Sequence, residues 1–251
     1  MSIYACSDLH GMLHLYKTVK EFLKPEDKVF FLGDAGDRGP HPWETIKAVL
    51  EDPQFIYIKG NHEDMLCDAL LGYIEDGCPD YGAAHKLSIN GGDETFEQAI
   101  RESDVAKYER KLRNLSLYQE YVNTSGERIV LSHAGFTPWK EDFFADDEEK
   151  RDIIFRVPHP KDLIWDRDHF LDKWTEEDCV DCIIIHGHTP VPYLLDDIDP
   201  ACTMYEVEPG ALWYCDGKKC CIDAGAVFTG YFSLLDLNTW DEHIFTTEAY
   251  L

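Results

Sequence analysis

"GDAGDRGP", residues 33–40, directly follows the apolar run "KVFFL" and places two aspartates and one arginine among three glycines. A short apolar strand, a glycine-bearing polar turn and an amphipathic helix together form a βα unit. This order occurs three times in the first 75 residues: "IYACSD" before "LHLYKTVKEFLK", "KVFFLGD" before "PWETIKAVLED", and "FIYIKGN" before "HEDMLCDALLGY". The repetition predicts parallel strands covered by helices, and hence an α/β fold.

The second half of the chain has a different pattern, with apolar runs that are joined by turn residues. "YQEYVNTSGERIVLSHAG" predicts a hairpin around Ser125-Gly126, "DCIIIHGHTP" predicts a buried strand, and "ALWYCDGKKCCIDAGAV" and "YFSLLDLNTWDEHIF" predict further hairpins. Between the two halves, residues 76–117 are expected to form a helical insertion or cap, with helices near 93–102 and 104–115. No segment rich in Pro, Gly or Ser divides the chain, so we expect a single domain over 1–251 with two packed sheets.

Charge and composition restrict the partners. The 251 residues contain 23 Lys and Arg against 49 Asp and Glu, a formal net charge of −26, together with 44% hydrophobic residues. This composition predicts a packed globule, most of whose acids form a solvated surface. A field of that sign repels polyanions, so we expect no binding to nucleic acid or to an anionic membrane.

Cysteine usage and the N-terminal residues favour a cytoplasmic protein. Nine cysteines occur without a regular framework, which favours reduced thiols. "MSIYACSDLHG" lacks a basic segment followed by an apolar one, and no uncharged apolar run approaches the roughly 20 residues that span a bilayer. Cys215, Cys220 and Cys221 in "YCDGKKCC" are expected to be strand residues flanking an Asp-Gly turn, since a structural zinc site would need a second cysteine pair.

Metal-ligating side chains follow the predicted strands. In open α/β sheets the ligand sites lie outside the carboxyl ends of the strands. Those positions hold Asp8, His10, Asp34, Asp37, Arg38, Asn61, His62, His133 and His188. Taken singly, an aspartate there can cap a helix and a histidine can be structural. Taken together, oxygen and imidazole ligands without a thiolate suit Mn²⁺, Fe or Zn²⁺, and they are numerous enough for two ions bridged by one carboxylate.

Five motifs carry a family resemblance: "SDLHG" (7–11), "GDAGDRG" (33–39), "GNHE" (60–63), "SHAG" (132–135) and "GHTP" (187–190). In this order they resemble the phosphoprotein phosphatase branch of the calcineurin-like metallophosphoesterases. "NGG" (90–92), "IWDR" (164–167) and "IDAGAVFTG" (222–230) are similar to the small bacterial and phage serine/threonine protein phosphatases, typified by the bacteriophage lambda phosphatase. The resemblance implies a four-layer α/β/β/α sandwich with two mixed sheets.

The resemblance also implies a dinuclear metal centre, with Mn²⁺ as the expected metal and Fe or Zn²⁺ as alternatives. The implied ligands are Asp8, His10 and Asp34 for one ion, and Asp34, Asn61, His133 and His188 for the other. A hydroxide bridging the ions would attack the phosphorus in line.

Further residues of the motifs have implied roles beside the metals. Arg38, Arg167 and Asn61 would bind the substrate phosphate, while Asp37 would orient His62 to protonate the leaving group. Gly36 departs from the family, which usually has an apolar residue there, commonly Val. His186, two residues before His188, has no role in the family pattern and is expected to be a packed or hydrogen-bonding residue.

The resemblance predicts a serine/threonine protein phosphatase that acts on phosphorylated proteins or peptides, with phosphotyrosine as a further substrate. The negative charge favours basic phosphopeptides. One alternative is symmetrical hydrolysis of dinucleoside polyphosphates such as diadenosine tetraphosphate, although such relatives often lack the acid found here at Asp37. Another is a catalytically silent scaffold, which should have lost a ligand, the Asp37–His62 pair or an arginine. The sequence makes no prediction of the oligomeric state.

Overall fold

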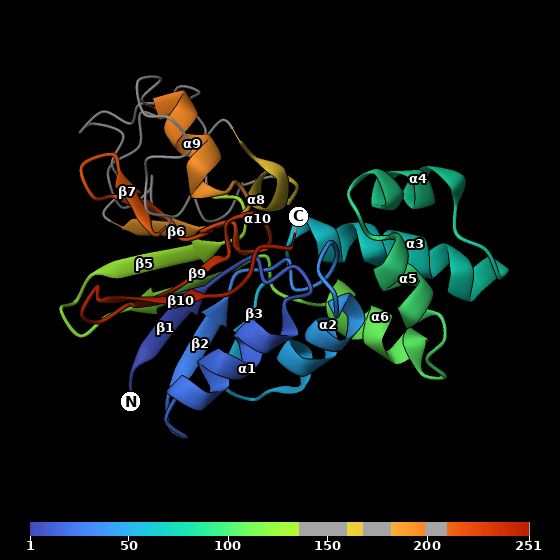
Figure 1. Ribbon diagram of the computed structural model, residues 1–251, viewed down its shortest axis with the longest axis horizontal. Coiled ribbons are helices and arrows are strands. Elements are labelled where there is room, and N and C mark those ends of the chain that lie inside the picture. The colour runs from blue at the N-terminus through green and yellow to red at the C-terminus, as the bar shows by residue number, and fades with distance from the viewer. Residues whose placement is uncertain (136–159, 168–181, 199–209, 251) are drawn as a thin grey trace, which may run out of the picture.

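The structure is a computed structural model that describes residues 1–135, 160–167, 182–198 and 210–250, with the backbone alone over 195–198 (Figure 1). Within these residues the strands form two five-stranded sheets, with the orders β10-β9-β1-β2-β3 and β4-β5-β6-β8-β7. Both sheets contain parallel and antiparallel pairs. The α/β fold with two mixed sheets is therefore confirmed.

The first sheet contains the three predicted βα units. Strands β1 (Ile3–Cys6), β2 (Lys28–Phe31) and β3 (Phe55–Tyr57) are parallel, and they lead into α1 (Leu13–Phe22), α2 (Pro42–Glu51) and α3 (Asn61–Asp76). The predicted C-terminal hairpin, β9 (Tyr231–Asp236) and β10 (Glu242–Thr246), extends this sheet by pairing with β1. The carboxyl ends of β1, β2 and β3 consequently meet at one edge.

The second sheet contains the other predicted hairpins. β4 (Tyr118–Val122) pairs antiparallel with β5 (Arg128–Ser132), and β7 (Leu212–Tyr214) pairs in the same way with β8 (Lys219–Cys221). Strand β6 (Ile183–His186) lies between β5 and β8 and is parallel to both. Cys220 and Cys221 are strand residues, but Cys215 lies in the turn with φ 50°, so its predicted place in a strand was wrong.

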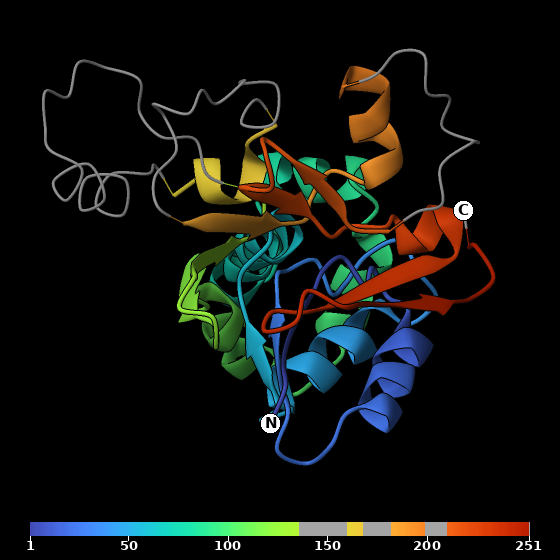
Figure 2. The ribbon, with the colours of Figure 1, turned by 90° about the vertical axis from the view of Figure 1, so that its left-hand side faces the viewer.

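Alternating strand residues build the layers. Ile3 and Ala5 of β1 face Leu131 and Ile185 of the second sheet in one apolar cluster. The residues between them face the other way: Tyr4 and Cys6 pack with residues of α1 and α2. On the outer side of the second sheet lie α8 (Asp162–Trp165) and α9 (Val191–Ile198) (Figure 2). Short helix α10 (Ala226–Thr229) precedes β9. Helices thus cover both outer faces of the paired sheets, as in the four-layer sandwich.

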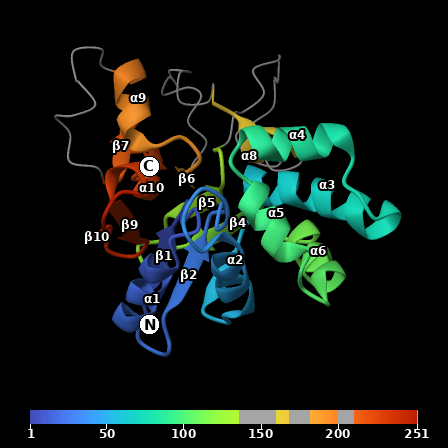
Figure 3. The ribbon, with the colours of Figure 1, turned by 45° about the vertical axis from the view of Figure 1, so that its right-hand side comes forward.

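The segment after α3 is helical and lies to one side of the sheets (Figure 3). It contains α4 (Tyr81–Ile89), α5 (Asp93–Ala99) and α6 (Val105–Arg113). Helices α5 and α6 are the two that the sequence predicts, each a few residues shorter. Helix α4 was not predicted, although Asp80 marks its start by accepting hydrogen bonds from the backbone N–H groups of Gly82 and Ala83 at 2.9 and 3.1 Å.

The described residues can be compared with the expectations of reduced thiols and of no membrane-spanning segment. Six cysteines described there are free thiols, as the sequence predicts: Cys6, Cys67, Cys78, Cys215, Cys220 and Cys221. None of the helices in the described ranges combines the length and the apolar character that crossing a bilayer requires.

Candidate metal centre

Unusual backbone conformations position many of the predicted site residues at the strand ends. Six of them have φ between 40° and 70°, in the left-handed region that non-glycine residues rarely adopt: Asp8, His10, Asp34, Asp37, Arg38 and His188. Such conformations are unfavourable and persist where the surrounding structure requires them. The turns after β1, β2 and β6 therefore hold these side chains in directions that an ordinary turn would not give.

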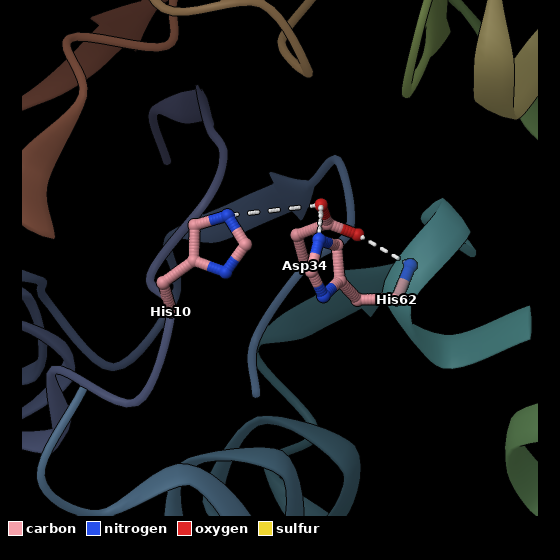
Figure 4. A group of neighbouring side chains, drawn as sticks. All are labelled: His10, Asp34 and His62. Atoms are coloured by element: carbon pink, nitrogen blue, oxygen red, sulfur yellow. Dashed lines mark hydrogen bonds and ion pairs between the residues drawn. The ribbon is translucent and has the colours of Figure 1, made fainter. Parts of the chain in front are cut away.

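Asp34 lies at the centre of the convergence (Figure 4). Its Oδ2 atom is 3.8 Å from His10 Nε2 and 3.7 Å from His62 Nε2, while its Oδ1 atom accepts a hydrogen bond from the backbone N–H of His62 at 3.1 Å. Ligand atoms of these three buried residues lie within 4.8 Å of one another. They form the first of two groups that could hold a metal ion.

The second group shares Asp34 and adds His133 and His188 from the other sheet. Asp34 Oδ2 is 3.4 Å from His133 Nε2, which is 3.1 Å from His188 Nδ1. Asn61 Oδ1 lies 2.9 Å from His133 Nε2 and 3.1 Å from His188 Nδ1. One carboxylate thus stands between two groups of nitrogen and oxygen ligands, which is the arrangement expected of a bridging ligand.

Asp8 faces the first group with a free oxygen. Its Oδ2 atom accepts hydrogen bonds from the Ser7 hydroxyl and from the backbone N–H of His188, the latter at 3.1 Å. Its Oδ1 atom is 3.7 Å from His10 Nε2 and is buried without a hydrogen-bond partner, alone in this among the side chains of the described residues. A buried carboxylate oxygen without a donor is unfavourable, and a cation would satisfy it.

Backbone carbonyls fix the orientation of two imidazoles. His10 Nδ1 donates to the carbonyl of Gly36 at 3.0 Å, and His133 Nδ1 donates to the carbonyl of Leu32 at 2.7 Å. With Nδ1 held in this way, Nε2 is the atom of each ring that faces Asp34, at 3.8 Å for His10 and 3.4 Å for His133. Metal-ligating histidines are held in this way in proteins generally.

Beside these groups lies the pair formed by Asp37 and His62. His62 Nδ1 is 2.5 Å from Asp37 Oδ2, and both side chains are buried. The Arg38 guanidinium lies beside both rings, 3.0 Å from Nε2 of His62 and 2.7 Å from Nε2 of His10. Arg167 is exposed and lies beside the second group, with its Nε 3.4 Å from His188 Nε2. All the predicted site residues are therefore brought together.

Burial and mutual charge shift the pKa values of the central groups in the ion-free protein. Burial raises the pKa of Asp8 to about 6, and the nearby Asp34 carboxylate acts in the same direction. Burial also opposes ionisation of Asp34, but His133 and His62 outweigh it and hold its pKa well below the usual range. Burial would lower the pKa of His133, yet the Asp34 carboxylate raises it to about 10.

The pKa of His62 is raised in the same manner as that of His133. Burial disfavours the charged imidazole, but the carboxylates of Asp34 and Asp37 more than compensate. His188 shows the opposite result, because burial and the neighbouring His133 together lower its pKa well below the usual range. The raised pKa of His62 favours its charged form, in which the imidazole has a proton to donate beside the centre.

Glu63 is an important residue whose role the sequence analysis missed. Its carboxylate accepts hydrogen bonds from the backbone N–H groups of Asp34 (2.8 Å), Ala35 (3.0 Å) and Gly60 (2.9 Å), and from the Tyr57 hydroxyl (2.7 Å). It thereby joins the turn after β2 to the start of α3. The signal in the sequence was its position in "GNHE", three residues after Gly60, where a glutamate can complete a helix capping box.

Gly36 and His186 have structural explanations. A Cβ atom at Gly36 would lie 2.6 Å from Ile46 Cδ1, so Ile46 already fills the space that an apolar side chain would take. His186 is buried, and its Nε2 is 2.6 Å from the Tyr214 hydroxyl. Its expected role as a packed, hydrogen-bonding residue is confirmed.

Residues 1–220 match the family model described as calcineurin-like phosphoesterase, and the chain belongs to this family. A solved structure of a serine/threonine phosphatase from Saccharomyces cerevisiae superposes with a TM-score of 0.55 at 14% identity, covering 99% of this chain and 80% of the other. The family uses a dinuclear metal centre, and the two groups that share Asp34 are candidates for its ligands.

Two named activities occur among the curated relatives. A bis(5'-nucleosyl)-tetraphosphatase PrpE [asymmetrical] of Anoxybacillus flavithermus is 24% identical over 209 residues, covering 73% of this chain and 77% of its own length. A serine/threonine-protein phosphatase 2 of Salmonella typhimurium is 30% identical over 139 residues, covering 53% of this chain and 58% of its own length. The chain is thus a phosphoesterase with relatives of both substrate classes, and the dinucleotide relatives are named asymmetrical rather than symmetrical.

Proposed function

We propose that this protein is a metal-dependent serine/threonine protein phosphatase that also accepts phosphotyrosine. The observation that carries the proposal is the 2.5 Å contact between His62 Nδ1 and Asp37 Oδ2, with His62 Nε2 directed towards Asp34. Hydrolysis of an alkyl phosphate releases a poor leaving group, the alkoxide of serine or threonine. Such a reaction benefits most from a positioned acid, whose contribution is typically about 10²–10⁴-fold.

The proposed ligands fit two divalent ions, and we expect Mn²⁺. They are Asp8, His10 and Asp34 for one ion, and Asp34, Asn61, His133 and His188 for the other. The unpartnered oxygen of Asp8 and the Nε2 atoms of His10 and His133, which both face Asp34, support this assignment. Two bound ions would lower the pKa of a coordinated water and polarise the phosphoryl group.

His62 is grouped geometrically with His10 and Asp34, but we assign it as the acid rather than as a ligand. Its Nδ1 proton is held by Asp37, so the ring can carry a second proton on Nε2 and pass it to the departing oxygen. Arg38, next to Asp37 in the same turn, and Arg167, beside His188, are proposed to bind the phosphate oxygens together with Asn61. Guanidinium groups suit this role because their planar donors match a phosphate.

Hydrolysis of dinucleoside tetraphosphates is a second candidate, favoured by the name of the relative that matches 73% of this chain. Its leaving group is a nucleotide phosphate, which needs less protonation than an alkoxide. The metal centre would serve both reactions. A silent scaffold is disfavoured, because the chain has every proposed metal ligand, both members of the acid pair and both arginines.

The deciding experiment strips the purified protein with a chelator and restores Mn²⁺, Mg²⁺, Zn²⁺ or Fe²⁺ one at a time. Phosphate release from a phosphothreonine peptide is measured beside cleavage of diadenosine tetraphosphate. We expect peptide turnover that depends on added metal and is greatest with Mn²⁺. Dinucleotide cleavage without peptide turnover would instead establish the second candidate, and no turnover of either would favour the scaffold.

A further inference from the structure

Thr95 contacts the proposed acid pair from a distant part of the chain. It lies in the first turn of α5 and is fully buried. Its hydroxyl donates to Asp37 Oδ1 and accepts a hydrogen bond from the backbone N–H of Asp37 at 3.1 Å. Both a side-chain oxygen and the backbone of one member of the pair are therefore held by one threonine, 58 residues away in sequence.

Gly91 and Gly92, which precede α5, contact the turn that holds Asp37 and Arg38. The carbonyl of Gly91 accepts a hydrogen bond from the backbone N–H of Arg38 at 3.3 Å. A Cβ atom at Gly92 would stand 3.0 Å from Asp37 Oδ2, so the backbone of this connection packs directly against the oxygen that contacts His62. Asp37 and Arg38 have φ values of 67° and 64°, conformations that require such external support.

The carboxylate of Asp37 has a separate partner for each oxygen. Oδ1 is held by Thr95, and Oδ2 contacts His62. If the hydroxyl were removed, Oδ1 would be a buried oxygen without this donor, and the carboxylate could rotate or attract another donor. Either change would move Oδ2 away from His62 Nδ1.

We propose that Thr95 is a positioning residue for the Asp37–His62 pair, and that the connection between α4 and α5 is part of the active site. The inference rests on the proposed function, because it presumes that His62 protonates the leaving group. It gives the helical segment after α3 a specific role, since Thr95 fixes Asp37, which in turn fixes the acid.

The test compares Thr95→Val, Thr95→Ser and Thr45→Val in the full-length, metal-loaded protein. Thr45 is a matched control, because it is equally buried and its hydroxyl donates to the carbonyl of His41 at 2.7 Å, away from the centre. For Thr95→Val we expect kcat on a phosphothreonine peptide to fall about tenfold, a fraction of what an acid supplies. On p-nitrophenyl phosphate, whose leaving group needs little protonation, we expect a loss of less than about threefold.

Thr95→Ser should restore both rates, and Thr45→Val should change neither. Equal losses by Thr95→Val on the two substrates would overturn the positioning role and leave only a general effect on folding. His62→Asn separates this failure from that of the proposed function. If His62→Asn leaves peptide turnover unchanged, then His62 is not the acid at all, whatever Thr95→Val does.

A second measurement does not depend on activity. In the metal-free protein the ¹H and ¹⁵N resonances of His62 Nδ1–H report its contact with Asp37. We expect Thr95→Val to move this proton resonance upfield or broaden it by exchange, Thr95→Ser to restore it, and Thr45→Val to leave it in place. An unchanged resonance in Thr95→Val would overturn the proposal even if the activity fell.

Discussion

The two sheets contribute to the site in different ways. Residues from the first sheet are held by their own neighbours: His10 by the carbonyl of Gly36, and the turn of Asp34 by Glu63. Histidines from the second sheet are held by the first. His133 donates from Nδ1 to the carbonyl of Leu32, and the backbone N–H of His188 donates to Asp8 Oδ2.

This difference indicates that the N-terminal βα units position the ligands of both groups. The first sheet can arrange its ligands through contacts among β1, β2, β3 and α3, whereas the second group requires that the two sheets be packed. A change in the first sheet should consequently disturb both groups. A change on the side of the second sheet should leave the first group intact.

Asp34→Asn should have the largest effect, because Asp34 belongs to both groups. We expect activity to fall at least about 10²–10³-fold, the loss that follows removal of one preorganised charge-stabilising group. Metal content measured by mass spectrometry should fall below two ions per chain. Asp52→Asn is the control, since Asp52 accepts from the Tyr16 hydroxyl at 2.7 Å far from this centre and should not affect the metals. Retention of two ions by Asp34→Asn would contradict the bridging role.

Asp8→Asn should raise the stability of the metal-free protein. Asp8 links the two sheets by accepting a hydrogen bond from His188 N–H, but its carboxylate is a buried charge, which is unfavourable. Its pKa is raised to about 6 in the folded state, against about 3.9 in an unfolded chain. The unfolded state therefore loses this proton first, and the carboxylate lowers stability as pH rises from about 4 to 6. At pH 7 the expected gain on substitution is up to about 3 kcal/mol.

Denaturant unfolding of the chelated protein at pH 4 and pH 7 tests this expectation. The gain from Asp8→Asn should be present at pH 7 and absent at pH 4. Asn can still accept the hydrogen bond from His188 N–H, so the link between the sheets is retained. A variant that is less stable than the parent at pH 7 would contradict the expectation that the buried Asp8 charge lowers stability.

The first sheet was also the more predictable half. Asp34, Asp37 and Arg38 stand in one turn after an obvious apolar strand, so a local pattern predicts their convergence with Asp8 and His62. Thr95 gave no such signal, because it reaches Asp37 across 58 residues through a helical segment whose packing no local pattern encodes. Five motifs in order were enough to predict the family, but they did not show that the second group takes its orientation from the first sheet.

Gly36 and helix α4 also show that local sequence patterns do not reveal tertiary contacts. Gly36 was a departure in sequence only, since Ile46 fills its place from α2. Helix α4 was missed because its apolar residues do not form a clear stripe; Leu87 is its buried residue. In both cases the decisive information is a tertiary contact.

Glu63→Gln should loosen the scaffold without removing a ligand. Its carboxylate binds three backbone N–H groups and the Tyr57 hydroxyl, and an amide cannot accept from all of them. We expect the affinity for both ions to fall about 10–100-fold, as when a residue that orients metal ligands is changed. Titration of metal into the chelated protein gives both affinities. Tyr57→Phe, which removes one donor, should have a smaller effect, and loss confined to one ion would contradict the shared scaffold.

Arg167→Ala should have the smallest effect and should leave both metal groups intact. Arg167 is exposed, and it approaches His188 from outside, with its Nε 3.4 Å from Nε2 of the ring. A hydrogen bond to a charged group contributes about 1.5–3 kcal/mol. Because Arg167 is exposed, we expect its bond to the phosphate to contribute an amount at the lower end of this range. Inhibition by phosphate or vanadate should therefore weaken about tenfold. Arg38→Ala should weaken it more, because the Arg38 guanidinium contacts both His10 and His62. If Arg167→Ala instead lowers the metal content, then the second group depends on its own side of the molecule, and the asymmetry between the sheets is wrong.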